Sequence, residues 1–158
     1  MGFQLSEEIE QAILDKESVI VIGSISKEGL PHVTVKNTIF LKDGRIGFYE
    51  LLEKSQTQKN LVYSLWFNKT VAINIITKDR KSYQIKGIPY KAIVSGHKFE
   101  EAYIHVQETI GDGIDLSAIW LIDINSVEEE TFSVKRNELE TEFPFEVHLD
   151  RLIKEEFR

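Results

Sequence analysis

The segment KSQTQKN holds the side chains in this sequence that are best suited to binding an anion. Ser55 and Gln58 have the spacing of a capping box, which predicts that a short helix begins here. The first N–H groups of a helix lack intrahelical partners and carry a partial positive charge, so they attract anions. Ser55 and Thr57 would add hydroxyl donors, and Lys54 and Lys59 would add formal charge. Two interpretations are open at this point: an ordinary capped surface helix, and a phosphate site.

Two further residues differ from their surroundings. Asn37 places an amide on the otherwise apolar face of a predicted strand, where it could be a bulge residue, a satisfied core amide or a ligand contact. Trp120 lies on the last predicted strand, where it could be a core residue or a platform on which a planar ligand stacks.

Most other kinds of active site lack their residues. The chain has no cysteine, which excludes thiolate nucleophiles, disulfides, iron–sulfur clusters and cysteine zinc sites. Its four histidines lack the spacing that places two metal ligands on one helix face, so we expect no metal. No phosphate-binding loop or dinucleotide fingerprint is present. Nineteen Lys and Arg against 26 Asp and Glu give a net charge of −7, which argues against a nucleic-acid partner and against binding to an anionic membrane.

The elements that would position these residues are mainly strands. Helices are predicted after Ser6, Ser55 and Gly96, and six strands at residues 18–26, 31–41, 45–49, 70–76, 83–95 and within 118–133. Four consecutive β-branched residues in the first strand predict burial on both of its faces. The turn Asp43-Gly44 predicts a hairpin, and lost alternation at Gly87 predicts a bulge. The expected fold class is therefore mainly β with a few helices, the six antiparallel strands closing into a small barrel.

The chain divides by composition into two parts. We expect a domain over residues 1–135 and an acidic C-terminal extension over 136–158. That extension carries Leu149, Leu152, Ile153 and Phe157 at the spacing of an amphipathic helix, which would pack on its own barrel or on a second subunit. No signal sequence or membrane span is recognisable, so a cytoplasmic protein is expected.

The order of several segments resembles the FMN-binding split barrel of the pyridoxamine 5′-phosphate oxidase-like superfamily. The segments are VIVIGSISKEGLPHVTV, DGRIGFY, KSQTQKNL, KTVAINI, YQIKGIPYKAIVSGHKFEEAY and AIWLIDINSV. The resemblance extends over residues 17–133 and is greatest to the small FMN-binding proteins. It rests on Glu-Gly-x-Pro-x-Val after the first strand, Lys-Asn-Leu in the short helix and Lys-Gly in the fifth strand.

This resemblance implies a homodimer with FMN in a groove between two split barrels. By position, the ring or ribityl chain of FMN would be contacted by Val35, Lys36, Asn37 and Thr38, and it would be flanked by Glu50 and Leu51. The phosphate would be met by Ser55, Gln56, Thr57 and Asn60. Trp120 would come from the partner subunit. Where many members have Arg and Lys after Ser or Thr, this chain has Gln56 and Thr57, and Lys54 or Lys59 would compensate.

The function that the resemblance implies is that of an FMN-binding flavoprotein, an oxidoreductase or electron carrier with a small-molecule redox partner. Because the flavin would supply the redox chemistry, no catalytic side chain is expected. The alternative is a non-catalytic split-barrel binding module that has lost FMN or binds another cofactor, haem or a deazaflavin.

Overall fold

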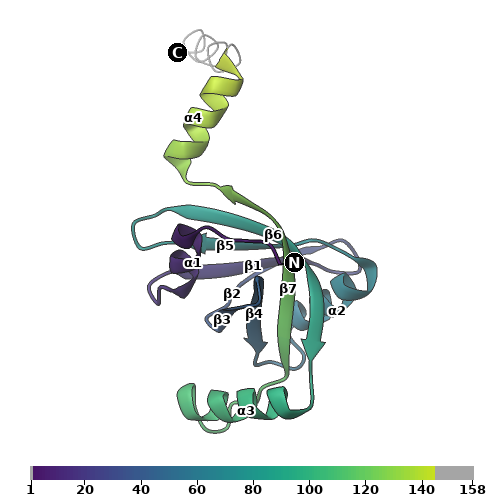
Figure 1. Cartoon of the computed structure of the whole chain (residues 1–158). Coiled ribbons are helices and arrows are strands. Elements are labelled where there is room, and N and C mark those ends of the chain that lie inside the picture. The colour runs from purple at the N-terminus through teal and green to yellow at the C-terminus, as the bar shows by residue number, and fades with distance from the viewer. Residues whose placement is uncertain (1, 145–158) are drawn as a thin grey trace, which may run out of the picture.

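The computed structural model describes residues 2–144, which form a curved antiparallel sheet with helices around it (Figure 1). In chain order the elements are α1 (Glu7–Leu14), β1 (Val19–Ile25), β2 (Pro31–Val35), β3 (Ile39–Lys42), β4 (Arg45–Glu50), α2 (Gln56–Phe67), β5 (Val71–Ile76), β6 (Ser82–Ile93), α3 (His97–Thr109), β7 (Ala118–Glu129) and α4 (Phe132–Glu142). The expectation of a mainly β protein with a few helices is confirmed.

Within the described residues the sheet has seven strands in the order β2-β1-β5-β6-β7-β4-β3, and it is not closed. The expectation of six strands in a closed barrel is therefore corrected. The long strands β6 and β7 arch through the middle of the sheet (Figure 1), while β2 and β3 form its two edges.

The additional strand comes from residues 31–41, which the alternation pattern predicts as one strand. β2 ends at Val35 after pairing with β1, and β3 begins at Ile39 and pairs with β4 at the opposite edge. The chain thus passes from one edge of the sheet to the other within three residues. Asn37 lies in this crossing and not on the apolar face of a continuous strand, so local alternation misrepresented its surroundings.

The prediction that β1 is buried on both faces is wrong. Ile20 and Ile22 face the core and are 6% and 0% exposed, whereas Val19 on the opposite face is 45% exposed. The register of β1 with β2 places Val21 opposite Val35 on that same side. We refer to Val19, Val21, Val33 and Val35 as the outer valine face. It is apolar, although the packed core lies on the other side of the strand.

Local signals for caps, turns and bulges are confirmed. The Ser6 side chain caps α1, and Asp43 and Gly44 have positive φ angles of 51° and 73°, the turn geometry that suits a tight hairpin. The β6–β7 register shifts between Lys86 and Gly87, so a bulge lies at the predicted place, but the extra residue is Asn125 of β7 and not a residue of β6. A Cβ atom at Gly87 would collide with the backbone oxygen of Asp123, so a larger residue would push the two strands apart.

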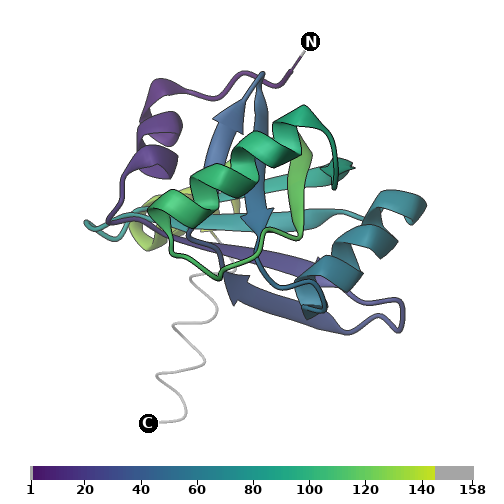
Figure 2. The same ribbon diagram turned by 90° about the horizontal axis from the view of Figure 1, so that it is seen from below.

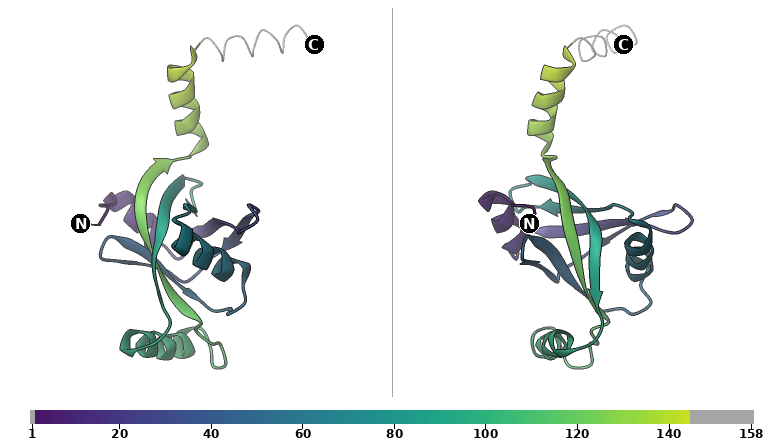
Figure 3. Two further views of the ribbon diagram at one scale, coloured as in Figure 1. Left: turned by 90° about the vertical axis from the view of Figure 1, so that its right-hand side faces the viewer. Right: turned by 45° about the vertical axis from the view of Figure 1, so that its right-hand side comes forward.

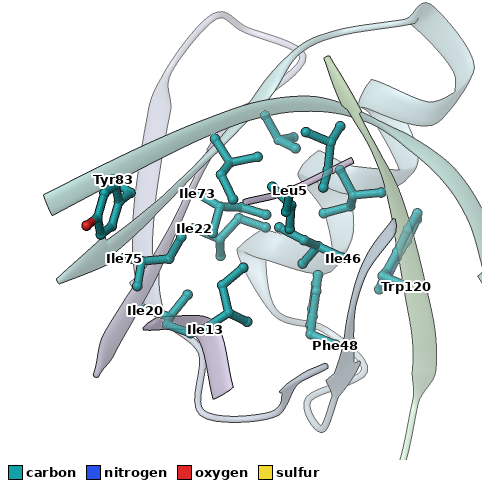
Figure 4. Packing of buried hydrophobic residues seen from close by; sticks show 14 of the residues in the cluster. Leu5, Ile13, Ile20, Ile22, Ile46, Phe48, Ile73, Ile75, Tyr83 and Trp120 are labelled. Carbon is teal, nitrogen blue, oxygen red and sulfur yellow. The ribbon is translucent and has the colours of Figure 1, made fainter. Parts of the chain in front are cut away.

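The main core fills the concave side of the sheet (Figure 4). Phe48, Trp120 and several isoleucines are fully enclosed, and each such side chain contributes roughly 1.5–3 kcal/mol by its removal from water. A second, smaller cluster lies under α3, where Ala102 and Val106 pack against Leu116 and Ile119. Figure 2 shows α3 lying across the strands β3 and β4.

Helix α4 stands away from the sheet (Figures 1 and 3) and has no buried residue. It begins at Phe132 and continues across the predicted domain boundary at residue 136, so the division into two parts stays a prediction. The apolar residues Leu149, Leu152, Ile153 and Phe157 lie outside the described residues. In the described part of the chain, no helix has both the length and the apolar character needed to cross a membrane.

Candidate functional site

Lys36 and Glu50 form a nearly buried ion pair where the chain crosses between the two edges of the sheet. Lys36 Nζ donates to Glu50 Oε2 over 2.8 Å, and the side chains are 13% and 1% exposed. The ammonium lies 5.3 Å from the centroid of the Phe48 ring, within cation–π range. Glu50 Oε1 accepts the N–H of Leu52 over 3.1 Å. Both carboxylate oxygens are therefore occupied, which fixes the end of β4 and the start of the loop that follows it.

The other residues assigned to the ring or ribityl chain differ in how accessible their side chains are to a ligand. Thr38 Oγ1 donates to the Tyr49 carbonyl over 2.8 Å and accepts the Tyr49 N–H over 3.2 Å, so this side chain continues the β3–β4 ladder by one residue. Asn37 is exposed beside a cavity of about 410 Å³ that Lys36 also lines. Val35 is 53% exposed, and Leu51 packs against the cluster under α3. Asn37 and Val35 are the accessible members of this group.

The loop after β4 connects this ion pair to the start of α2. The Ser55 N–H donates to the Leu52 carbonyl over 3.1 Å, and Ser55 Oγ accepts the Gln58 N–H over 3.0 Å, as expected of an N-cap. Hydrogen bonds thus run from Lys36 through Glu50 and Leu52 to Ser55. The structure brings together the strand and helix segments that the sequence analysis assigned to one site, which we call the Lys36–Glu50 site.

Two residues assigned to the phosphate point inward instead. Thr57 and Asn60 are each 1% exposed. Asn60 Nδ2 donates to Ser24 Oγ over 3.1 Å, and Asn60 Oδ1 accepts Gln56 Nε2 over 2.8 Å. Asn60 therefore holds α2 against β1. The expectation that the side chains of Thr57 and Asn60 meet a phosphate is corrected, because enclosed side chains do not reach the exposed end of the helix.

Trp120 also lies elsewhere than expected. It is 0% exposed in the main core (Figure 4), and its Nε1 donates to Gln58 Oε1 over 2.7 Å. No face of the indole is free to stack on a ligand, so its assignment as a platform from a partner subunit is corrected. From its position in the sequence, Gln58 is expected only to be part of a capping box. Its side chain instead satisfies a buried donor 62 positions away, and no local signal indicates that partner.

The hydrogen-bond donors that remain free, within the described residues, at the start of α2 are of the types that bind a phosphate monoester. The N–H groups of Gln56 and Thr57 have no protein partner in the part of the chain that the structure describes, and such groups bind anions. Lys54 and Lys59 are exposed and form no ion pair within residues 2–144. Ser55 retains a hydroxyl hydrogen. Among the described residues, no group of His, Asp and Glu could hold a metal ion.

Comparison with known proteins identifies the fold. No protein-family model and no curated protein sequence matches this chain. Several solved structures do match this chain. HupZ from Group A Streptococcus is 17% identical with a TM-score of 0.65, covering 82% of this chain and 96% of its own. An FMN-binding protein from Syntrophomonas wolfei is 9% identical with a TM-score of 0.58, covering 80% and 91%. HutZ, the haem storage protein from Vibrio cholerae, is 13% identical with a TM-score of 0.57, covering 80% and 95%.

Other structures at this level of similarity are an F420 reductase and pyridoxamine 5′-phosphate oxidase-like proteins. Identities this low show a common fold, not a common activity. The fold is the one that the order of sequence motifs suggested: this chain has the split-barrel fold found in FMN-binding and pyridoxamine 5′-phosphate oxidase-like proteins.

Proposed function

We propose that this protein binds FMN as a homodimer and acts as a flavin-dependent oxidoreductase or electron carrier with a small-molecule redox partner. The observation that carries this proposal is the hydrogen-bonded connection from Lys36 through Glu50 to Ser55. FMN has a flat ring at one end and a charged phosphate at the other, so its site needs a strand region and an anion site on one continuous surface. Bound FMN would supply the redox chemistry.

The residues proposed to hold FMN divide into two groups. The accessible Val35 and Asn37 would contact the ring or ribityl chain, while Lys36, Thr38, Glu50 and Leu51 hold the backbone around them in place. Ser55, the N–H groups of Gln56 and Thr57, and the ammonium groups of Lys54 and Lys59 would receive the phosphate. The side chains of Thr57, Asn60 and Trp120 are not part of this proposal, because they are enclosed.

The homodimer is supported by the outer valine face. Val33 and Val35 are 67% and 53% exposed, and Val19 on the same face is 45% exposed. A contiguous apolar surface of this kind is typical of an interaction site. Since Val35 belongs both to this face and to the proposed cofactor site, a second copy that covers the face would also shield the bound flavin from water.

Titration with FMN, followed by quenching of flavin fluorescence, tests the phosphate assignment. We expect the double variant Lys54→Glu/Lys59→Glu to bind FMN at least about tenfold more weakly, because two carboxylates would repel the phosphate. Lys27→Glu is the matched control, since Lys27 is an exposed lysine in the β1–β2 turn. Riboflavin, which lacks the phosphate, should bind the wild type and the double variant with the same affinity. Equal FMN affinity in the wild type and the double variant would contradict the assignment.

Sedimentation tests the dimer. Val33→Asp places a charge in the centre of the outer valine face without entering the core, so we expect a folded monomer that has lost FMN binding. A variant that remains dimeric, or that is monomeric and binds FMN as before, would contradict the proposed arrangement.

A second candidate is a binding module for haem or a deazaflavin. It is favoured by the small number of charges at the start of α2, where Gln56 and the buried Thr57 occupy positions that are basic in many split barrels. Among the similar structures, one is a haem storage protein and another an F420 reductase. Absorbance titrations with FMN, haem and F420 separate the candidates. Saturable binding of haem or F420 by protein that does not bind FMN would support the second one.

A further inference from the structure

A separate cavity of about 570 Å³ lies between α3 and the strands β3, β4, β6 and β7. Figure 2 shows how α3 crosses over β3 and β4. The volume falls within the roughly 300–1,000 Å³ that small-molecule sites occupy. We call this cavity the α3 pocket. Its lining includes no residue that we assign to FMN, so the α3 pocket is distinct from the proposed flavin site.

The floor of the α3 pocket is apolar and aromatic. Phe40, Tyr49, Ala102 and Ile119 contribute to it from both sides. The rings of Phe40 and Tyr49 lie 5.2 Å apart, and His105 meets Tyr49 edge-on at 6.3 Å. Burial raises the pKa of Tyr49, so its phenol stays neutral at physiological pH. Such a floor suits a flat, uncharged ring system.

The rim of the α3 pocket carries positive charge that the protein leaves unpaired. Lys42, Lys91 and Lys98 come from β3, β6 and α3, and all three are exposed. None of them has a carboxylate partner among residues 2–144. In contrast, Arg45 is held by Asp123 over 2.6 Å and lies 4.0 Å from the centroid of the Tyr90 ring.

Two carboxylates, Asp43 and Glu101, also line the α3 pocket, and Glu101 Oε1 lies 2.9 Å from His97 Nε2. The lining therefore holds four permanent cations against two acids, on a protein whose net charge is −7. Three unpaired lysines that come from separate elements and surround one cavity are unexpected on such an acidic chain. They favour an anionic ligand at this place.

We propose that the α3 pocket binds a nucleoside monophosphate, in which an aromatic base is joined to a phosphate ester. The base lies on the floor formed by Phe40, Tyr49 and Ile119, and the phosphate is held by Lys91 and Lys98 at the rim. Lysine suits this task because a flexible ammonium can follow a phosphate as a point charge.

Calorimetric titration with AMP, adenosine and inorganic phosphate tests both parts of the proposal. We expect AMP to bind, and adenosine and inorganic phosphate each to bind at least about tenfold more weakly, since each lacks one of the two recognition elements. AMP binding that is absent, matched by adenosine or matched by phosphate would overturn the proposal.

Charge reversal locates the binding site. The double variant Lys91→Glu/Lys98→Glu should bind AMP at least about tenfold more weakly, whereas Lys27→Glu should bind it as the wild type does. The far-ultraviolet circular dichroism of each variant shows whether it is folded. FMN affinity in the double variant should be unchanged, which keeps failure of this proposal distinct from failure of the FMN proposal. Unchanged AMP affinity in the double variant would overturn the assignment.

Discussion

The Lys36–Glu50 site and the α3 pocket use charged residues in opposite ways. At the Lys36–Glu50 site the ammonium and carboxylate are buried against each other, and the neighbouring polar groups hold backbone segments together. At the α3 pocket, lysines of three elements are exposed and unpaired within the described residues. The first region could be found from sequence motifs, yet many of its polar groups stabilise the fold. The second has no motif, yet its charges are available to a ligand.

The largest expected effect is on stability at the Lys36–Glu50 site. Lys36→Met removes the cation and leaves the Glu50 carboxylate, 1% exposed, without its partner. We expect the free energy of unfolding, measured by urea denaturation, to fall by about 3–5 kcal/mol. The double variant Lys36→Met/Glu50→Gln should be more stable than Lys36→Met, because it no longer buries a lone charge. A loss below about 1 kcal/mol in the single variant would show that water already hydrates Glu50.

The hydrogen bond between Gln58 and Trp120 should show a smaller effect of the same kind. Gln58→Leu removes the acceptor of a fully buried indole N–H. An unsatisfied buried donor costs about 1–3 kcal/mol, which urea denaturation measures. Lys59→Ala, at an exposed position of the same helix, is the control and should change stability by less than about 0.5 kcal/mol. If both variants were equally stable, the bond would have no structural role.

At the α3 pocket the opposite behaviour is expected. Lys91→Glu/Lys98→Glu should leave the free energy of unfolding within about 1 kcal/mol of the wild type, because exposed substitutions rarely exceed about 0.5 kcal/mol each. Urea denaturation again provides the measurement. A loss as large as that expected for Lys36→Met would remove the contrast between the two regions, since the lysines would then be part of the fold.

The polar cluster around the exposed Glu8 gives the smallest effect and serves as a reference. Tyr83 Oη donates to Glu8 Oε1 over 2.6 Å, and together with Lys81 this lowers the pKa of Glu8 below its ordinary value of 4.5. Because the folded-state pKa is the lower one, the stabilisation is present above pH 4.5 and is lost as the pH falls through the folded-state value.

The matching variant is Tyr83→Phe, which removes the main cause of this shift. The melting temperature of the wild type should fall more steeply below pH 4.5 than that of the variant, as differential scanning fluorimetry across this pH range would show. Parallel pH profiles would mean that the hydroxyl does not interact with Glu8 in solution.

Local signals in the sequence were sufficient for most elements of the fold. Ser6 and Ser55 mark helix starts, Asp43 and Gly44 mark a hairpin, and Gly87 marks a bulge, because each effect acts within a few residues. The prediction of one strand over residues 31–41 was wrong because it also rested on a local signal. Its alternation is continuous, but the choice of partner strand changes at Lys36, and alternation contains no information about partners.

The candidate site was predictable to a similar extent. The segments around Lys36, Glu50 and Ser55, which the resemblance assigns to one site, do lie together in the folded chain, and that they hold FMN stays a prediction. The direction in which individual side chains point could not be predicted from the sequence. Asn60 turns toward Ser24, and Gln58 toward Trp120, because each satisfies a buried polar group on a strand distant in sequence.

Residue types and interactions between near neighbours were enough to establish where most helices and strands begin, that the protein is mainly β, and that thiolate chemistry is excluded. Three other properties emerged from the folded chain alone: the sheet stays open, valines of β1 and β2 face outward, and three lysines from separate elements surround one cavity. Burial and electrostatic pairing depend on which distant segments meet, and that is set by the packing of the whole chain.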